Sequence, residues 1–91
     1  MILNCYSIYD NVAKCYNTPF FCLNTGVARR MVYDLVADVN STLHAHPADY
    51  VLFRLCEVDM GSGQVKQDDG KPYYICNCAE FQSESSAAVI V

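Results

Sequence analysis

Two histidines and two of the six cysteines are the residues of this chain whose types and spacing could bind a metal. His44 and His46 lie two positions apart, and Cys76 and Cys78 have the same spacing. Imidazole nitrogen and thiolate sulfur are the usual ligands of structural zinc. Such sites normally carry their cysteines on tight knuckles, as in C-x-x-C, and the C-N-C string here lacks that geometry. We therefore expect no metal and no cofactor, but a surface loop in which one histidine caps the turn before Pro47.

A cysteine and a histidine could also form a nucleophile with its base. Cys56, His46 and Asp49 supply the residue types that such a site needs, which are a thiolate, a base and a group that orients the base. Their spacing does not require them to meet, and most thiols in a reducing compartment are inert. The stretch 68–70 (DDG) resembles part of a cation loop without the full calcium-loop spacing. We expect an acidic turn there, and no enzymatic activity.

Basic and aromatic residues together could bind single-stranded nucleic acid by phosphate contact and base stacking. The chain has six Lys and Arg against ten Asp and Glu, which gives a net charge of −4. That balance opposes a general nucleic-acid or anionic-membrane binder, because phosphate contacts need cations. A local patch remains the alternative, and its candidates are Lys14, Tyr16, Arg29, Arg30 and Arg54.

One segment, Thr25–Val39, has helical periodicity, and it must be positioned by the rest of the chain. Asn24 or Thr25 supplies the N-cap oxygen, and Arg30 and Asp34 are one turn apart and can pair. We expect a sheet to cover the whole apolar stripe of this helix. The stripe consists of Val27, Met31, Leu35 and Val39, widened by Ala28, Val32 and Val36.

Alternating apolar residues and turn signals predict strands at 2–9, 14–23, 50–58 and 73–78. The second of these is interrupted at Pro19, and proline cannot donate to a strand ladder, so it is expected to be an edge. The summed pattern ββαββ predicts an α+β fold. In it, a four-stranded antiparallel sheet carries one helix on one face.

The length of 91 residues suits one domain, which we place at residues 1–81. Residues 82–91 are expected to form a C-terminal tail that is loose or docks on a partner. The sequence shows no signal peptide and no apolar run long enough to span a membrane. We therefore expect a cytosolic chain whose six cysteines are reduced and mostly fill space in strands.

Several short strings, in this order, resemble one protein family. The chain over most of residues 6–63 is similar to the small nonstructural protein of gokushovirus-like microviruses, which are single-stranded DNA phages. The His-Pro-x-Asp-Tyr string after the helix is the most specific part. Val32 stands where the family often has Phe, Ala48 where it has Glu, and the stretch after Gly63 matches poorly. The matching residues are Ile8-Tyr9-Asp10, Pro19-Phe20, Asn24, Ala28, Arg30, Asp34, His46-Pro47-Ala48-Asp49-Tyr50, Leu52-Phe53, Asp59 and Gly63.

The resemblance implies a nonstructural phage protein in the cytoplasm of a bacterial host. It implies a role in genome replication or in the switch to single-stranded DNA synthesis and packaging, and it brings no catalytic residues. We expect protein–protein interaction with phage or host replication proteins, a homodimer as a further expectation, and no membrane contact. The alternative is direct binding of single-stranded DNA. The candidate partner-binding residues are Arg29, Arg30, Tyr33, His46, Asp49 and Tyr50, although Asp49 could instead brace its turn and Tyr50 could pack.

Overall fold

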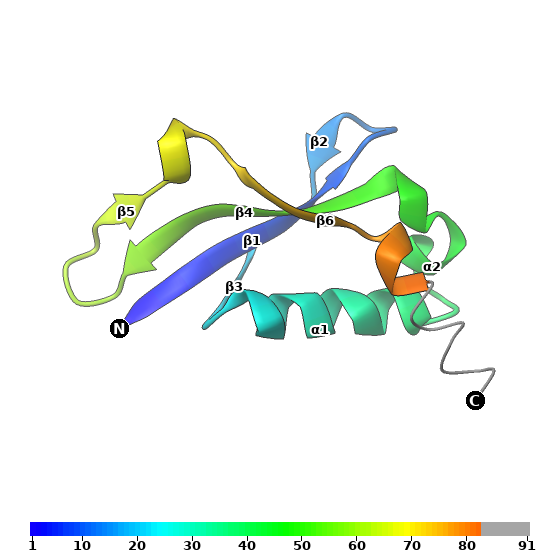
Figure 1. Cartoon of the computed structure of the whole chain (residues 1–91), viewed down its shortest axis with the longest axis horizontal. Helices are drawn as coiled ribbons and strands as arrows, with labels where there is room; N and C mark the ends of the chain where they lie inside the picture. The colour runs from blue at the N-terminus through cyan, green and yellow to red at the C-terminus, as the bar shows by residue number, and fades with distance from the viewer. Residues whose placement is uncertain (83–91) are drawn as a thin grey trace.

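The computed structural model of the chain describes residues 1–82 (Figure 1). Two long strands form its centre, β1 (Ile2–Asp10) and β4 (Tyr50–Asp59), which pair antiparallel from Ile2 opposite Asp59 to Asp10 opposite Tyr50. The register shifts once, beside Cys5 and Tyr6, where β4 has one extra residue. Such a bulge increases the local twist of the pair. Beyond Gln82, the expected C-terminal tail lies outside the described residues.

Each edge of the sheet is built from two short strands. β2 (Cys15–Tyr16) and β3 (Phe20–Cys22) both pair with β1, and β5 (Val65–Lys66) and β6 (Tyr73–Asn77) both pair with β4, all antiparallel. The gap between β2 and β3 contains Pro19, as the sequence predicted. Residues 1–82 thus form one six-stranded antiparallel sheet.

The α+β class and the antiparallel sheet are confirmed, and the count of four strands with a single helix is corrected. The physical reason lies at the edges. Proline divides the expected strand 14–23 into β2 and β3, and on the other edge a short strand, β5, forms ahead of the turn expected at 68–70. That turn is a 3-10 turn, η2 (Asp68–Gly70), in which Asp69 and Gly70 both have positive φ. β4 therefore has two separate partners along one side.

Helix α1 (Thr25–Ala37) begins as expected, with Asn24 as N-cap accepting a 2.9 Å hydrogen bond from the Val27 amide. It ends at Ala37 and not at Val39, because Asp38 adopts extended backbone angles. The ring nitrogen Nδ1 of His44 lies 2.7 Å from the Val36 carbonyl oxygen and so satisfies one of the open carbonyls of the last turn.

The connection after α1 is more ordered than the loop that the sequence predicted. It contains a short helix, α2 (Thr42–Ala45), capped by the Ser41 hydroxyl, which accepts from the Leu43 amide at 3.1 Å. A 3-10 turn, η1 (Pro47–Asp49), follows with proline at its start, as predicted. Among residues 1–82, no helix has the length and apolar character needed to cross a membrane.

The core lies between α1 and one face of the sheet (Figure 1). Only one of the two apolar rows of α1 is buried there, and it consists of Ala28, Val32 and Val36. The row of Val27, Met31 and Leu35 stays partly exposed, so the prediction that the sheet covers the whole stripe is wrong. The sheet on that side ends at β3, which is only three residues long. The sheet side of the core includes Tyr6, Ile8, Leu52 and Cys76.

Candidate interaction surface

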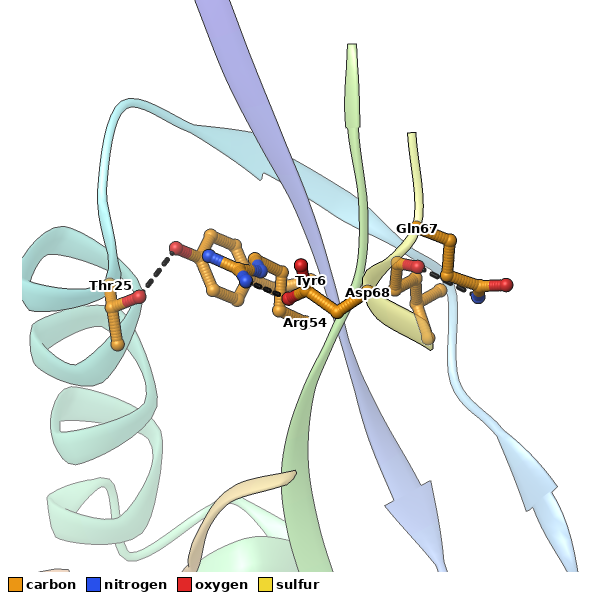
Figure 2. Close-up of polar contacts among 6 residues, drawn as sticks. Tyr6, Thr25, Arg54, Gln67 and Asp68 are labelled. Carbon is orange, nitrogen blue, oxygen red and sulfur yellow. Dashed lines mark hydrogen bonds and ion pairs between the residues drawn. The ribbon is translucent and has the colours of Figure 1, made fainter. Parts of the chain in front are cut away.

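An open hollow of about 660 Å³ lies between the first turn of α1 and the segment that joins β5 to β6. Its lining includes Thr25, Arg54, Asp68 and Tyr73. Arg54 forms an ion pair with Asp68, and this hydrogen bond is the main reason why the pKa of Arg54 is raised. The Arg54 guanidinium also lies 5.2 Å from the centroid of the Tyr73 ring. Figure 2 shows the Tyr6 hydroxyl directed to Thr25 and the Arg54 guanidinium directed to Asp68.

The polar side chains around this hollow already have hydrogen-bond partners within the protein. The Tyr6 and Thr25 hydroxyls are 2.8 Å apart, and the Gln67 side-chain amide donates to the Leu55 carbonyl at 2.9 Å (Figure 2). The Arg54 cation is therefore already paired with a carboxylate, and the Tyr6 and Thr25 hydroxyls are hydrogen-bonded to each other. The first contact joins β1 to α1, and the Arg54 and Gln67 contacts join β4 to the β5–β6 segment, so all of them have a structural role.

The histidines and cysteines considered as ligands belong to different elements, with His44 in α2 and Cys76 in β6. His44 is bonded to the end of α1, and Cys56 lies opposite Cys5 in the β1–β4 ladder. Burial, with neighbouring Cys76 and Glu80, raises the pKa of the Cys78 thiol to about 12, so this thiol stays protonated at neutral pH. No three His, Cys, Asp or Glu side chains within residues 1–82 gather as a metal site would require.

Four aromatic rings form a continuous row across the sheet face opposite α1, which we call the aromatic row. Tyr16 and Tyr9 have ring centroids 4.9 Å apart, Tyr16 and Phe53 5.6 Å, and Phe53 and Tyr74 6.1 Å, all edge to face. The register places them on one face. Tyr16 is opposite Tyr9, and Phe53 is opposite both Ser7 and Tyr74, whereas Tyr6 points into the core.

The aromatic row is accessible. Tyr74 is 56% exposed and Tyr16 is 37% exposed, and no α-helix of residues 1–82 covers this face (Figure 1). Burial and the neighbouring Tyr9 raise the pKa of the Tyr16 hydroxyl, so this hydroxyl stays neutral at physiological pH. An uncharged band of rings on a rigid sheet can bind an apolar protein surface, or can stack on bases.

The predicted partner-binding residues of α1 have different environments. Arg29 lies over the Phe81 ring, 5.0 Å from its centroid, and Tyr33 contacts the same ring edge to face at 6.2 Å. Both therefore help to hold the segment after β6 against α1. Arg30 is exposed on the helix.

The other three predicted partner residues lie beyond the end of α1, around η1. His46 is exposed and joins α2 to η1, while the Asp49 carbonyl accepts a 2.9 Å hydrogen bond from the Asn11 amide. Tyr50 packs against the core, and its carbonyl accepts from the Cys78 amide. Tyr50 is thus a packed ring, while the Asp49 contact is made by its backbone carbonyl and not by its carboxylate.

The five nucleic-acid candidates do not form one patch. Lys14 and Tyr16 belong to the β1–β2 hairpin, with Tyr16 in the aromatic row. Arg54 lies opposite Tyr6 in the β1–β4 register, so its side chain is on the sheet face opposite the aromatic row. It also forms an ion pair with Asp68. Arg29 and Arg30 are on α1. Of the four cationic candidates, Lys14 is therefore the one that shares a hairpin with a member of the aromatic row.

Three members of the aromatic row, Tyr9, Phe53 and Tyr74, were missed as functional candidates in the sequence. The alternation of side chains along a strand assigns each ring to one side of its own strand, but it does not show that the three rings share one face of the sheet. That assignment needs the β1–β4 and β4–β6 registers, which both contain a shift.

The family model described as Phage ORF5 protein matches residues 3–81. The chain belongs to this family. The matched range contains every strand and helix named above, including the whole aromatic row, apart from the first residue of β1. The Phage ORF5 assignment confirms the sequence-based resemblance as far as a small phage protein. No curated protein and no solved structure matches the chain.

Proposed function

We propose that this phage protein is a non-enzymatic, nonstructural protein of the microvirus type. It acts in the host cytoplasm in viral genome replication, or in the switch to single-stranded DNA synthesis and packaging. It does so by binding phage or host replication proteins. The support is family membership together with the sequence strings that resemble the gokushovirus-like nonstructural protein.

The aromatic row is the observation that carries an interaction role. Protein interfaces are enriched in aromatic residues and depleted of Lys, Glu and Asp at their centres. The row supplies Tyr and Phe rings on a rigid antiparallel sheet, so little side-chain freedom is lost on binding. Tyr74, the most exposed ring, is the expected centre of contact.

The test is a complementation experiment in infected cells. The phage gene is disrupted and replaced in trans by wild-type chain, by Tyr74→Ser, or by a control, Val12→Ser, which changes an exposed apolar residue in the β1–β2 turn. Strand-specific hybridisation measures the ratio of single-stranded to double-stranded viral DNA. We expect disruption to lower this ratio, and we expect wild type and Val12→Ser, but not Tyr74→Ser, to restore it.

A ratio that disruption leaves unchanged would reject the role in replication. Restoration by Tyr74→Ser as complete as by wild type would instead reject the aromatic row as the contact surface. The folded state of Tyr74→Ser is checked by circular dichroism, so that loss of activity is not confused with loss of structure.

Direct binding of single-stranded DNA is the second candidate, and the same row favours it. Sheet-borne aromatic rings are platforms on which bases stack, and Lys14 precedes Tyr16 by two residues. The net charge of −4 and the neutralised Arg54 work against it. Protein–protein interaction is therefore the main proposal.

The two candidates respond differently to salt. A DNA binder should bind labelled single-stranded oligonucleotide at low ionic strength and lose affinity steeply as salt rises, because counterions are released from the phosphates. Tyr74→Ser and Lys14→Gln should both weaken that binding. No binding at low salt rejects the DNA candidate and leaves the protein-binding proposal intact.

A further inference from the structure

A row of exposed apolar residues follows α1 and its two ends, and we call it the apolar strip. Its members recur at every fourth position, and their exposed fractions are 60% for Leu23, 41% for Val27, 43% for Met31, 42% for Leu35 and 74% for Val39. The sheet covers the neighbouring row of α1 instead, and Phe81 covers the side that carries Arg29 and Tyr33. The strip is thus the one apolar row of α1 without cover in residues 1–82.

Two opposite charges accompany the centre of the strip. Arg30 and Asp34 are both exposed, and with 100° of rotation per residue they lie on the same side of Met31. The sequence suggested that they pair within the helix. The structure has one ion pair among residues 1–82, between Arg54 and Asp68, so Arg30 and Asp34 both remain available.

We propose that the apolar strip is a self-association surface, on which α1 packs antiparallel against α1 of a second copy of this chain. A two-fold axis at Met31 places Met31 against itself and Val27 against Leu35 of the second copy. Two ridges at i, i+4 spacing are the surfaces that interdigitate in the commonest class of helix packing. An isologous contact of this kind needs one self-complementary patch, and the strip has that property.

The charges select both the partner and the direction. A rise of about 1.5 Å per residue puts Arg30 about 1.5 Å to one side of the axis, and Asp34 of the second copy about 4.5 Å to the same side. Each Arg30 therefore meets an Asp34 across the interface, twice in the dimer. Parallel packing, with the two-fold axis along the helices, would instead put Arg30 and Asp34 of the two copies on opposite edges of the contact, so that neither charge would meet its opposite. This inference does not depend on the proposed function.

The first experiment is sedimentation equilibrium of the full chain in reducing buffer, over a range of concentrations. We expect a reversible dimer. Met31→Glu places two carboxylates on the axis and should raise the dissociation constant by roughly 30-fold or more, the scale of a central hot spot. Val12→Glu is the control, because Val12 is equally apolar and 74% exposed but lies beyond β1, away from α1. It should leave the dissociation constant unchanged.

A charge exchange then tests the geometry. Arg30→Asp alone and Asp34→Arg alone each bring like charges together across the interface and should weaken the dimer by about tenfold. The double variant restores opposite charges and should return the dissociation constant to within about twofold of wild type. A surface that merely excludes water would not show this recovery.

Several outcomes would overturn the proposal. The proposal is wrong if the wild-type chain stays monomeric at about 100 μM, a concentration at which even a weak dimer would form. It is also wrong if Met31→Glu leaves the dimer intact. Failure of the double charge variant to recover overturns the antiparallel geometry. If a chain ending at Gln82 dimerises while the full chain does not, the occupant of the strip is the chain's own segment 83–91 and not a second copy.

Discussion

The Tyr6 hydroxyl lies 2.8 Å from the Thr25 hydroxyl, and this bond joins the middle of β1 to the first residue of α1. The Tyr6 ring is fully buried and stacks with Phe20 at a centroid distance of 6.0 Å. Phenylalanine keeps that packing and removes only the hydroxyl.

Tyr6→Phe should therefore lower the free energy of unfolding by about 1 kcal/mol, the usual net value of a hydrogen bond. Urea unfolding at neutral pH measures it. Thr25→Val removes the other partner, and the double variant should lose clearly less than the sum of the two single losses. Strict additivity would show that the two hydroxyls are not coupled.

A matched pair of valines tests which row of α1 is buried. Val32→Ala removes two methyl groups from a fully buried site and should lower the free energy of unfolding by about 2 kcal/mol, including the cavity left behind. Val27→Ala, on the apolar strip, should change it by less than about 0.5 kcal/mol in the monomer. Both are measured by urea unfolding at low micromolar concentration. Equal losses would contradict the burial pattern.

Asn24 is expected to be a stabilising N-cap. Its side-chain oxygen accepts from the Val27 amide at 2.9 Å, so Asn24→Ala should lower the free energy of unfolding by about 1 kcal/mol. Asn24→Ser or Asn24→Asp keeps an acceptor and should retain most of the stability. Thermal unfolding of the four proteins gives the order, and an alanine variant as stable as the serine variant would argue against the cap.

The buried Cys78 thiol predicts a loss of stability in alkaline solution. Its pKa is near 9.0 when exposed and about 12 in the folded chain. The folded state therefore holds its proton where the unfolded state has lost it. The stabilisation that the Cys78 thiol contributes is fully present below pH 9. Above pH 9 its contribution to the free energy of unfolding falls by up to about 1.4 kcal/mol per pH unit.

Cys78→Ala should remove this contribution. The difference in unfolding free energy between wild type and Cys78→Ala should shrink by about 1 kcal/mol between pH 7 and pH 9.5, in reducing buffer. The raised pKa values of Cys5 and Cys22 also act at high pH, but they are common to both proteins and cancel. A pH-independent difference would mean that Cys78 ionises as easily in the folded chain as in the unfolded chain.

The elements with a local cause were predictable from the sequence. The N-cap at Asn24, the break at Pro19 and the proline-initiated turn at Pro47 all follow from side-chain or backbone chemistry within a few residues. The buried row of α1 was not predictable in this way, because both apolar rows recur at the same spacing. Which row faces the sheet depends on where β3 ends and on which side of α1 Phe81 packs.

The aromatic row was hidden for a related reason. Tyr9 and Phe53 come from strands 40 and more residues apart, and a shift in register by one residue would put them on opposite faces. The Arg54–Asp68 pair likewise depends on the path of the β5–β6 segment, which has no periodic pattern. Long-range pairing thus decided both the candidate surface and the removal of Arg54 from it.

The division of each sheet edge into two short strands makes edge-to-edge pairing with strands of other molecules less favourable. A long edge strand presents a row of unpaired amides and carbonyls that can template amyloid-like growth. In residues 1–82 the outer strands contain only two, three, two and five residues, and two of the gaps carry proline or positive-φ residues. Residues 1–82 of a newly made copy therefore offer its neighbours no extended ladder on which to add strands, even when many molecules are synthesised together.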